Sequence, residues 1–261
     1  MTVYRASSFV LCSNLTLIVP PRVVLRGTED DASNSGDVAW PTLPWLEHPS
    51  LPCNDCAYAC GAGCGPAKRA WMYAHNVSNV TITGGGEMHG GGRWWWCARD
   101  PHQTPRPNPL PGYCSKRNAT NTLRGVCPPR MIHLIGARDV VMRNISFTNS
   151  PFWMMHLQFC DGVLLDAVRM FNPNTPSYEA PNGDGVDIGS SRNIQIRNSV
   201  LDMSDDQVCV RAGQGHAAAI QSVGTGVGEG GHRVERTDFR ARNVFFSVLP
   251  FFPSDRLGGS P

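Results

Sequence analysis

The sequence contains few charged residues and no long apolar segment. Charged residues make up 17% of the 261 residues, and the formal net charge is only +2. Nucleic-acid-binding domains usually carry a strong basic excess, so this balance argues against nucleic acid as a partner. No apolar run is long enough to cross a bilayer, which argues against a membrane-spanning protein.

The first residues also lack a convincing secretory signal. Residues 8–20 hold an apolar run that polar Ser13-Asn14 interrupts, and the run ends at Pro20-Pro21, as a strand would. Other features favour export, so we expect the true start of the protein to lie upstream of Met1.

Lysine is nearly absent from the chain. Lys68 and Lys116 are its two lysines, and arginine supplies the other cations. Guanidinium groups bind carboxylates through two parallel hydrogen bonds, which suits an acidic partner. Genome composition explains the same bias at least as well.

Cysteine, in contrast, is abundant, with ten residues. Five glycosylation sequons begin at Asn14, Asn76, Asn79, Asn118 and Asn144, although some of these asparagines also suit a strand. Together they favour a secreted protein with disulfides.

Four of the cysteines, Cys53, Cys56, Cys60 and Cys64, form a dense cluster. Its spacing lacks the paired C-x2-C of a zinc module, so we expect disulfides there, and no metal and no cofactor in the protein.

Short β-branched, alternating runs recur along the chain and are separated by turn residues, which predicts strands. Val140 precedes Val163 by 23 residues, and Val163 precedes Ile194 by 31, a loose period typical of a β-solenoid. A β-sandwich is the alternative, but its strands recur every 8–12 residues or so. The expected strands are residues 14–19, 79–83, 139–147, 162–165, 193–197 and 240–246.

Composition also predicts the domain organisation. We expect one β-helix domain over residues 1–261, with irregular Cys- and Pro-rich insertions at about 28–69 and 100–129. The tail after about residue 248 is expected to be poorly ordered.

Three carboxylates are candidates for one site. Asp184 lies in Asn182-Gly-Asp-Gly-Val-Asp187, and Asp205-Asp206 follow; Asp205 is 21 residues, about one coil, after Asp184. Stacked coils would place these acids side by side. Repulsion between their negative charges would then push their pKa values apart, so that one acid becomes a proton donor and another a base. An Asp-Gly pair can also simply mark a turn, but Asp205-Asp206 has no adjacent glycine.

Several motifs in this order resemble glycoside hydrolase family 28, the polygalacturonases and related pectin hydrolases. They are Asn149-Ser-Pro-Phe-Trp-Met-Met-His156, Asn182-Gly-Asp-Gly-Val-Asp187, Ser204-Asp-Asp-Gln-Val-Cys209, the segment Asn79–Gly84 and Trp94-Trp95-Trp96. The resemblance implies a right-handed parallel β-helix and hydrolysis of α-1,4-galacturonide linkages with inversion. It also implies Asp205 as general acid and Asp184 and Asp206 as bases.

The resemblance extends to further residues. Asn182 matches a sugar-contacting position, and Arg211 stands where the family often has Lys. His156 is interpreted either as a core residue or as a substrate contact, and Asp187 as a structural support of the turn. Gly183 replaces the usual Thr.

The chain departs from the family after Gly213. The nearest match to the family's Gly-His-Gly histidine is His216, only 10 residues after Asp206, as if one coil were missing. No Arg-x-Lys clamp for the substrate carboxylate follows, and the last coils and end cap are absent from the sequence.

Two hypotheses remain. One is a secreted or cell-wall, monomeric pectin hydrolase whose partner is the pectic polysaccharide. The other is a catalytically impaired, truncated relative that acts at most as a carbohydrate-binding β-helix.

Overall fold

The structure is a computed structural model that describes residues 1–28, 40–41, 68–99, 128–175, 178–180, 182–211 and 233–241. Most of the two expected insertions, the Cys53–Cys64 cluster and the tail after residue 248 lie outside these ranges. The single-domain plan, which depends on them, stays a prediction.

Two sheets carry almost all of the described secondary structure. The described strands of the first sheet are β1 (Thr2–Ala6), β3 (Leu15–Ile18), β4 (Val23–Gly27), β6 (Ser78–Thr83), β7 (Glu87–His89), β9 (Arg138–Thr148), β11 (Asp161–Phe171), β15 (Arg192–Asp202) and β17 (Arg233–Ala241). Those of the second are β2 (Phe9–Val10), β5 (Met72–His75), β8 (Ile132–Ile135), β10 (Met155–Gln158), β14 (Val186–Gly189) and β16 (Val208–Arg211).

Two smaller elements interrupt the strands. The strands β12 (Asn174–Thr175) and β13 (Tyr178–Glu179) form an antiparallel pair, and α2 (Gly92–Arg99) is a short helix. None of the described helices has the length and apolar character that a bilayer crossing requires.

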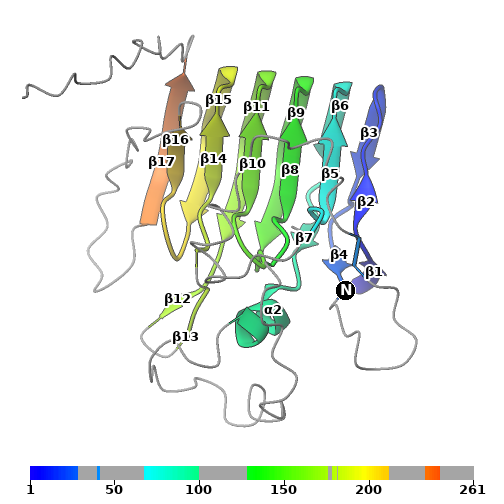
Figure 1. The fold of residues 1–261 in the computed structure, drawn as a ribbon, viewed down its shortest axis with the longest axis vertical. Coiled ribbons are helices and arrows are strands. Elements are labelled where there is room, and N and C mark those ends of the chain that lie inside the picture. The colour runs from blue at the N-terminus through cyan, green and yellow to red at the C-terminus, as the bar shows by residue number, and fades with distance from the viewer. Residues whose placement is uncertain are drawn as a thin grey trace, which may run out of the picture.

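The predicted stacking of coils is confirmed. Val163 pairs with Val140 on one side and with Ile194 on the other, so the 23- and 31-residue offsets are each one coil. The chain alternates between the sheets, and neighbouring strands such as β9, β11 and β15 run parallel and side by side (Figure 1). With the right-handed crossover that parallel strands prefer, this is the expected right-handed parallel β-helix.

The last described strand departs from this regularity. The strand β17 overlaps the start of the expected strand 240–246, but it pairs antiparallel with β15 and contains register shifts. A solenoid coil would add a parallel strand at this place.

The core lies between the two sheets. Alternate residues of each strand point inward and are buried, as Met142, Leu165 and Ile196 show on the first sheet. The second sheet contributes Leu134 and Leu157 in the same way. Its four-residue strands are buried on both faces, so their sequences do not alternate and the sequence analysis did not predict them.

Left-handed residues turn four successive coils at the same corner. Asn76, Gly136, Phe159 and Ser190 follow successive strands of the second sheet and have φ of 52°, 61°, 54° and 47°. At the next corner, Asn79 Nδ2 donates to Asn14 Oδ1 at 2.9 Å, and both residues have positive φ. Asparagine tolerates this conformation better than most residues, which gives these sequon asparagines a structural role.

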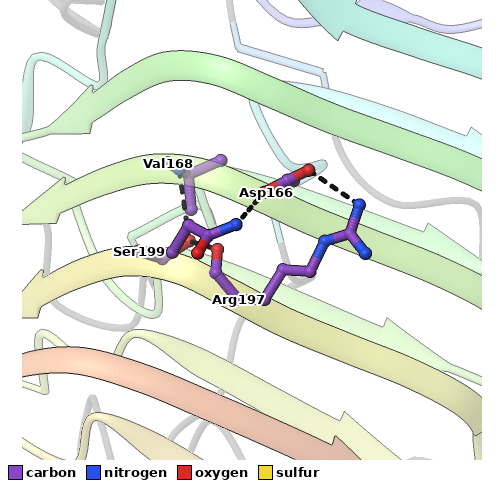
Figure 2. A network of polar contacts seen from close by, with 5 residues as sticks. Asp166, Val168, Arg197 and Ser199 are labelled. Atoms are coloured by element: carbon purple, nitrogen blue, oxygen red, sulfur yellow. Dashed lines mark hydrogen bonds and ion pairs between the residues drawn. The ribbon is translucent and has the colours of Figure 1, made fainter.

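A polar ladder links β11 and β15 on the outer face of the first sheet. Arg197 Nη2 donates to Asp166 Oδ2 at 2.9 Å, and this arginine is the main reason that the pKa of Asp166 is lowered (Figure 2). Beside it, Ala167 and Asn198 have positive φ and interrupt the backbone pairing. The buried Ser199 Oγ restores it by accepting the Val168 N–H at 3.2 Å (Figure 2).

Replacing Ser199 by Ala should therefore lower the free energy of unfolding by about 1–3 kcal/mol, because the buried Val168 N–H loses its acceptor. Chemical denaturation of the purified protein measures this change. Ser146→Ala on β9 is the control, since its partly exposed hydroxyl bonds no described residue. Equal losses in the two variants would contradict the assignment.

Of the described cysteines, Cys12 and Cys160 do not form disulfides. Burial raises the pKa of the Cys160 thiol to about 11, so it is a core residue rather than a reactive one. Within the described ranges, no group of His, Cys, Asp and Glu side chains is placed to hold a metal ion.

Candidate active site

Four residues occupy equivalent positions, each two residues before a strand of the second sheet. Arg130, Trp153, Asp184 and Asp206 precede β8, β10, β14 and β16. We call these four residues the corner file. Backbone hydrogen bonds connect their coils: Met131 N donates to Trp153 O at 3.1 Å, Met154 N to Asp184 O at 2.8 Å, and Gly185 N to Asp206 O at 2.8 Å. The corner file therefore runs along the solenoid, one residue from each coil.

The register refines the stacking that the sequence suggested. Val186 pairs with Val208, so the coil at this point has 22 residues and not 21. Asp184 consequently stacks on Asp206, and Asp205 lies level with Gly183. The backbones of all three acids still meet at one corner, on two adjacent coils.

The three acids differ in burial. Asp184 is only 4% exposed, Asp206 is partly buried, and Asp205 is exposed. Asp205 Oδ1 accepts the N–H of Asp206 at 3.0 Å, which orients its carboxylate. Unequal surroundings of neighbouring acids are what acid–base chemistry requires.

The turn before Asp184 is tightly packed. Asn182 begins it with φ of 49°. A Cβ on Gly183 would overlap Ser204 Oγ and lie 2.7 Å from Asn172 Nδ2. Ser204 Oγ is held there by donating to Ala180 O at 2.6 Å. The space that a larger side chain at position 183 would need is thus filled by Ser204 and Asn172.

Introducing Thr at position 183 should accordingly destabilise the protein by about 1–3 kcal/mol through overpacking, even though Thr is the residue usual in the resembling family. Adding Ser204→Gly should recover part of that loss, because it removes the nearest obstacle and leaves Asn172. Unfolding free energies of the two single variants and the double variant give the coupling. Purely additive losses would show that the two sites do not compete for space.

A row of rings lies on the outer side of the second sheet, next to the acids. His156 is aligned with His133 and Asp187 on neighbouring strands, and the two imidazoles stack with centroids 4.6 Å apart. Gln158 Oε1 lies 2.8 Å from His133 Nε2, and Trp153 meets His156 edge to face at 5.3 Å. His156 is only 4% exposed, which favours a supporting role over direct contact with a ligand.

The sequence analysis missed His133, although a signal was present. His133 precedes His156 by 23 residues, the same period that aligns Val140 with Val163. Asp187, interpreted from the sequence as a structural support of the turn, lies within β14 and is fully buried.

The two remaining predicted residues are only partly described. The backbone of Arg211 ends β16 and pairs with Gly189, while its side chain lies outside the described part. His216 lies outside it altogether.

Comparisons with known proteins point to one family. The family model for glycosyl hydrolases family 28 matches residues 62–234. A probable polygalacturonase of Arabidopsis thaliana is 26% identical over 169 residues, 60% of this chain and 33% of that protein. A polygalacturonase of Persea americana is 24% identical over 217 residues, 78% of this chain and 37% of that protein.

Solved structures agree on the fold. A polygalacturonase from Erwinia carotovora ssp. carotovora matches with a TM-score of 0.55 and 23% identity, over 83% of this chain and 50% of that one. An exopolygalacturonase from Thermotoga maritima matches with a TM-score of 0.54 and 18% identity, over 81% of this chain and 45% of that one. This chain spans about a third of the length of the Arabidopsis thaliana and Persea americana proteins. The family model covers well over half of this chain, which therefore belongs to glycosyl hydrolases family 28.

Proposed function

We propose that this protein hydrolyses the α-1,4-galacturonide linkages of pectin or polygalacturonan with inversion at the anomeric carbon. The observation that carries the proposal is the meeting of Asp184, Asp205 and Asp206 at one corner of adjacent coils, linked by the bond from Gly185 N to Asp206 O. A glycosidase needs one protonated and one ionised carboxyl group at the same linkage.

In the proposed reaction, Asp205 donates its proton to the glycosidic oxygen as the bond to the anomeric carbon breaks. Asp184 and Asp206 orient a water molecule and take one of its protons as its oxygen bonds to that carbon. The exposure of Asp205 supports its role, because the proton donor must reach the leaving sugar.

Geometry sets a requirement on these side chains. Inverting enzymes keep the two carboxyl groups about 6.5–9.5 Å apart to admit the water. Adjacent strands are only about 4.8 Å apart, so Asp205 and its base must diverge from their backbones. The offset of Asp205 by one residue from the corner file supports such divergence.

The other predicted residues take supporting roles in the proposal. Asn182 and Arg211 contact the sugar, and the positive charge of Arg211 faces a galacturonate carboxylate. His156 supports the site from behind, and His216 is the proposed counterpart of the family's catalytic histidine, on the resemblance of the sequence alone. The partner is pectic polysaccharide, and we propose a secreted, cell-wall, monomeric protein without a cofactor.

Release of reducing ends from polygalacturonate tests the proposal, and proton NMR of the first product tests its stereochemistry. Inversion of an α-linkage should give the β-anomer first. Release of the α-anomer first would contradict inversion, and absence of any release would contradict hydrolysis.

A non-catalytic carbohydrate-binding β-helix is the second candidate. The observation that favours it is the short spacing after Asp206, because the nearest match to the family's histidine, His216, follows only 10 residues later. Binding of polygalacturonate without release of reducing ends would support this candidate over the first.

A further inference from the structure

The corner that follows the second sheet carries an exposed aromatic residue. Phe159 comes directly after β10 and is 63% exposed, although its φ of 54° lies in the left-handed region. The equivalent corner residues of the neighbouring coils are Asn76, Gly136 and Ser190, which are all small or polar. A bulky side chain in this conformation strains the backbone, and an exposed ring stabilises the fold little through burial. The fold itself therefore gives no reason for a Phe at this position.

The two adjacent coils leave the ring of Phe159 accessible. Gly136 N donates to Gln158 O at 2.8 Å, and Phe159 N donates to Gly189 O at 3.0 Å. These bonds place Phe159 level with Gly136 on one side and with Ser190 on the other. Neither neighbour has a large side chain, so a ligand that runs along the solenoid axis can lie against the ring.

Arginines flank Phe159 two residues further along each coil. Arg138 and Arg192 pair in register with Asp161 from either side, about 10 Å apart across two strand spacings. Asp161 accepts from Arg192 Nη2 at 2.6 Å and from Asn193 Nδ2 at 2.7 Å. These two hydrogen bonds, and more weakly the charge of Arg138, lower the pKa of Asp161. Arg138 is exposed and donates to no described residue, so its guanidinium is available.

This combination of an exposed ring and an available guanidinium suits an acidic polysaccharide. A flat ring can cover the apolar C–H face of a sugar, and a guanidinium binds a carboxylate through two parallel hydrogen bonds. A uronic acid unit offers both groups. A protein partner would need a contiguous apolar patch of several hundred Å² or so, whereas this single ring has polar and charged neighbours.

We propose that Phe159 and Arg138 form a second, non-catalytic binding site for an acidic polysaccharide, with the ring against a sugar face and the guanidinium on a uronate carboxylate. The inference takes its ligand class from the proposed function. Ser190, at the same corner of the next coil, follows Asp184 by six residues, or at most about 20 Å of extended chain. The site thus lies at the opposite end of the second-sheet strands from the acids. A polymer held there stays close to the acids without occupying the cleaved linkage.

Phe159→Asn should change stability and binding in opposite directions. Asn tolerates the left-handed region, so we expect Tm to rise by about 2–4 °C. The Kd for polygalacturonate should rise about tenfold, because the sugar loses its apolar contact. Calorimetry in an Asp205→Asn background, where cleavage of the polymer is slow, measures this Kd. Phe159→Tyr keeps the ring and should retain the affinity.

Two matched controls address the ring and the charge separately. Phe171 is also exposed but lies within the strand β11, so Phe171→Asn should not raise Tm and should leave the Kd unchanged. Arg143 pairs in register with Asp166 as Arg138 does with its own aspartate, but no exposed ring precedes that row. Arg138→Gln should weaken binding about fivefold, and Arg143→Gln should leave it unchanged.

Several outcomes would overturn the inference. Unchanged polygalacturonate binding in Phe159→Asn would remove the ring from the site, and a fall in Tm would show that Phe159 serves the fold. An equal loss in Arg143→Gln would reduce the effect to general charge. The same dependence on Phe159 for polyglutamate, an acidic polymer without sugar, would exclude recognition of a carbohydrate.

Sedimentation tests the alternative that Phe159 joins two copies of this chain. Self-association that disappears in Phe159→Asn, with polygalacturonate binding unchanged, would make the ring an interface between copies and overturn the inference. None of these measurements requires turnover. Absence of hydrolysis by the unmodified protein would contradict the proposed function, while weaker binding of polygalacturonate by Phe159→Asn would still support the second site.

Discussion

Asp205→Asn should release reducing ends from polygalacturonate about 10²–10⁴ times more slowly than the unmodified protein, because loss of a general acid typically costs that much. The substitution is nearly isosteric. Asn keeps an oxygen that can accept the Asp206 N–H, so the turn before β16 should be preserved. Asp205 is exposed, and its replacement opens no cavity in the core. The expected loss is therefore one of chemistry and not of folding.

Asp166→Asn is the matched control. It also removes one carboxylate, but from the outer face of the first sheet, where Asp166 pairs with Arg197. Its rate should stay within about twofold of the unmodified protein, because exposed ion pairs contribute little to stability. Reducing-sugar assays at one ionic strength compare the three proteins. Equal rates in Asp205→Asn and Asp166→Asn would remove Asp205 from the reaction.

Trp71→Ala should lower the free energy of unfolding by about 3–5 kcal/mol, the range for truncating a buried Trp. Trp71 is fully buried and joins the first coil to the next. Its Nε1 donates to Ala6 O at 2.9 Å, and Phe9 packs edge-on at 5.6 Å. Because coils contact only their neighbours, the loss should act first on β1, β2 and β4. Hydrogen exchange should show faster opening there than in β11.

Trp71→Phe separates packing from the hydrogen bond. It keeps much of the ring volume and removes the donor to Ala6 O, so its loss should be clearly smaller than that of Trp71→Ala. Denaturant titration of both variants gives the two values. Uniform loss of exchange protection over β1 and β11 alike would contradict the view that this Trp acts locally.

The architecture was accessible from the sequence because one sheet has a solvent-facing side. Runs such as Arg138–Phe147 alternate buried and exposed residues, and their offsets give the coil length directly. The second sheet left no such pattern. Residues such as His133 and Ile135 face outward yet are 1% and 5% exposed, so alternation of burial disappears. Short strands that are covered on both faces can be found only by extending the register from the other sheet.

The candidate acids could be selected from the sequence, but the way in which their coils stack could not. The three acids were identified because carboxylates at about one coil's spacing are informative by themselves. The coil has 22 residues and not 21, and this difference of one residue decides which acids stack on each other. The loop between the coils, and not the motif, sets the coil length.

The unequal coil lengths have a consequence for how specificity can change in this fold. Met155 and Val186 are one coil apart by 31 residues, whereas Val186 and Val208 are apart by 22. The additional residues include the β12–β13 pair and end immediately before Asp184. Since the strand pairing is the same on either side, this segment can lengthen or shorten without shifting the ladder. Evolution can therefore reshape the approach to the acids while leaving their spacing intact.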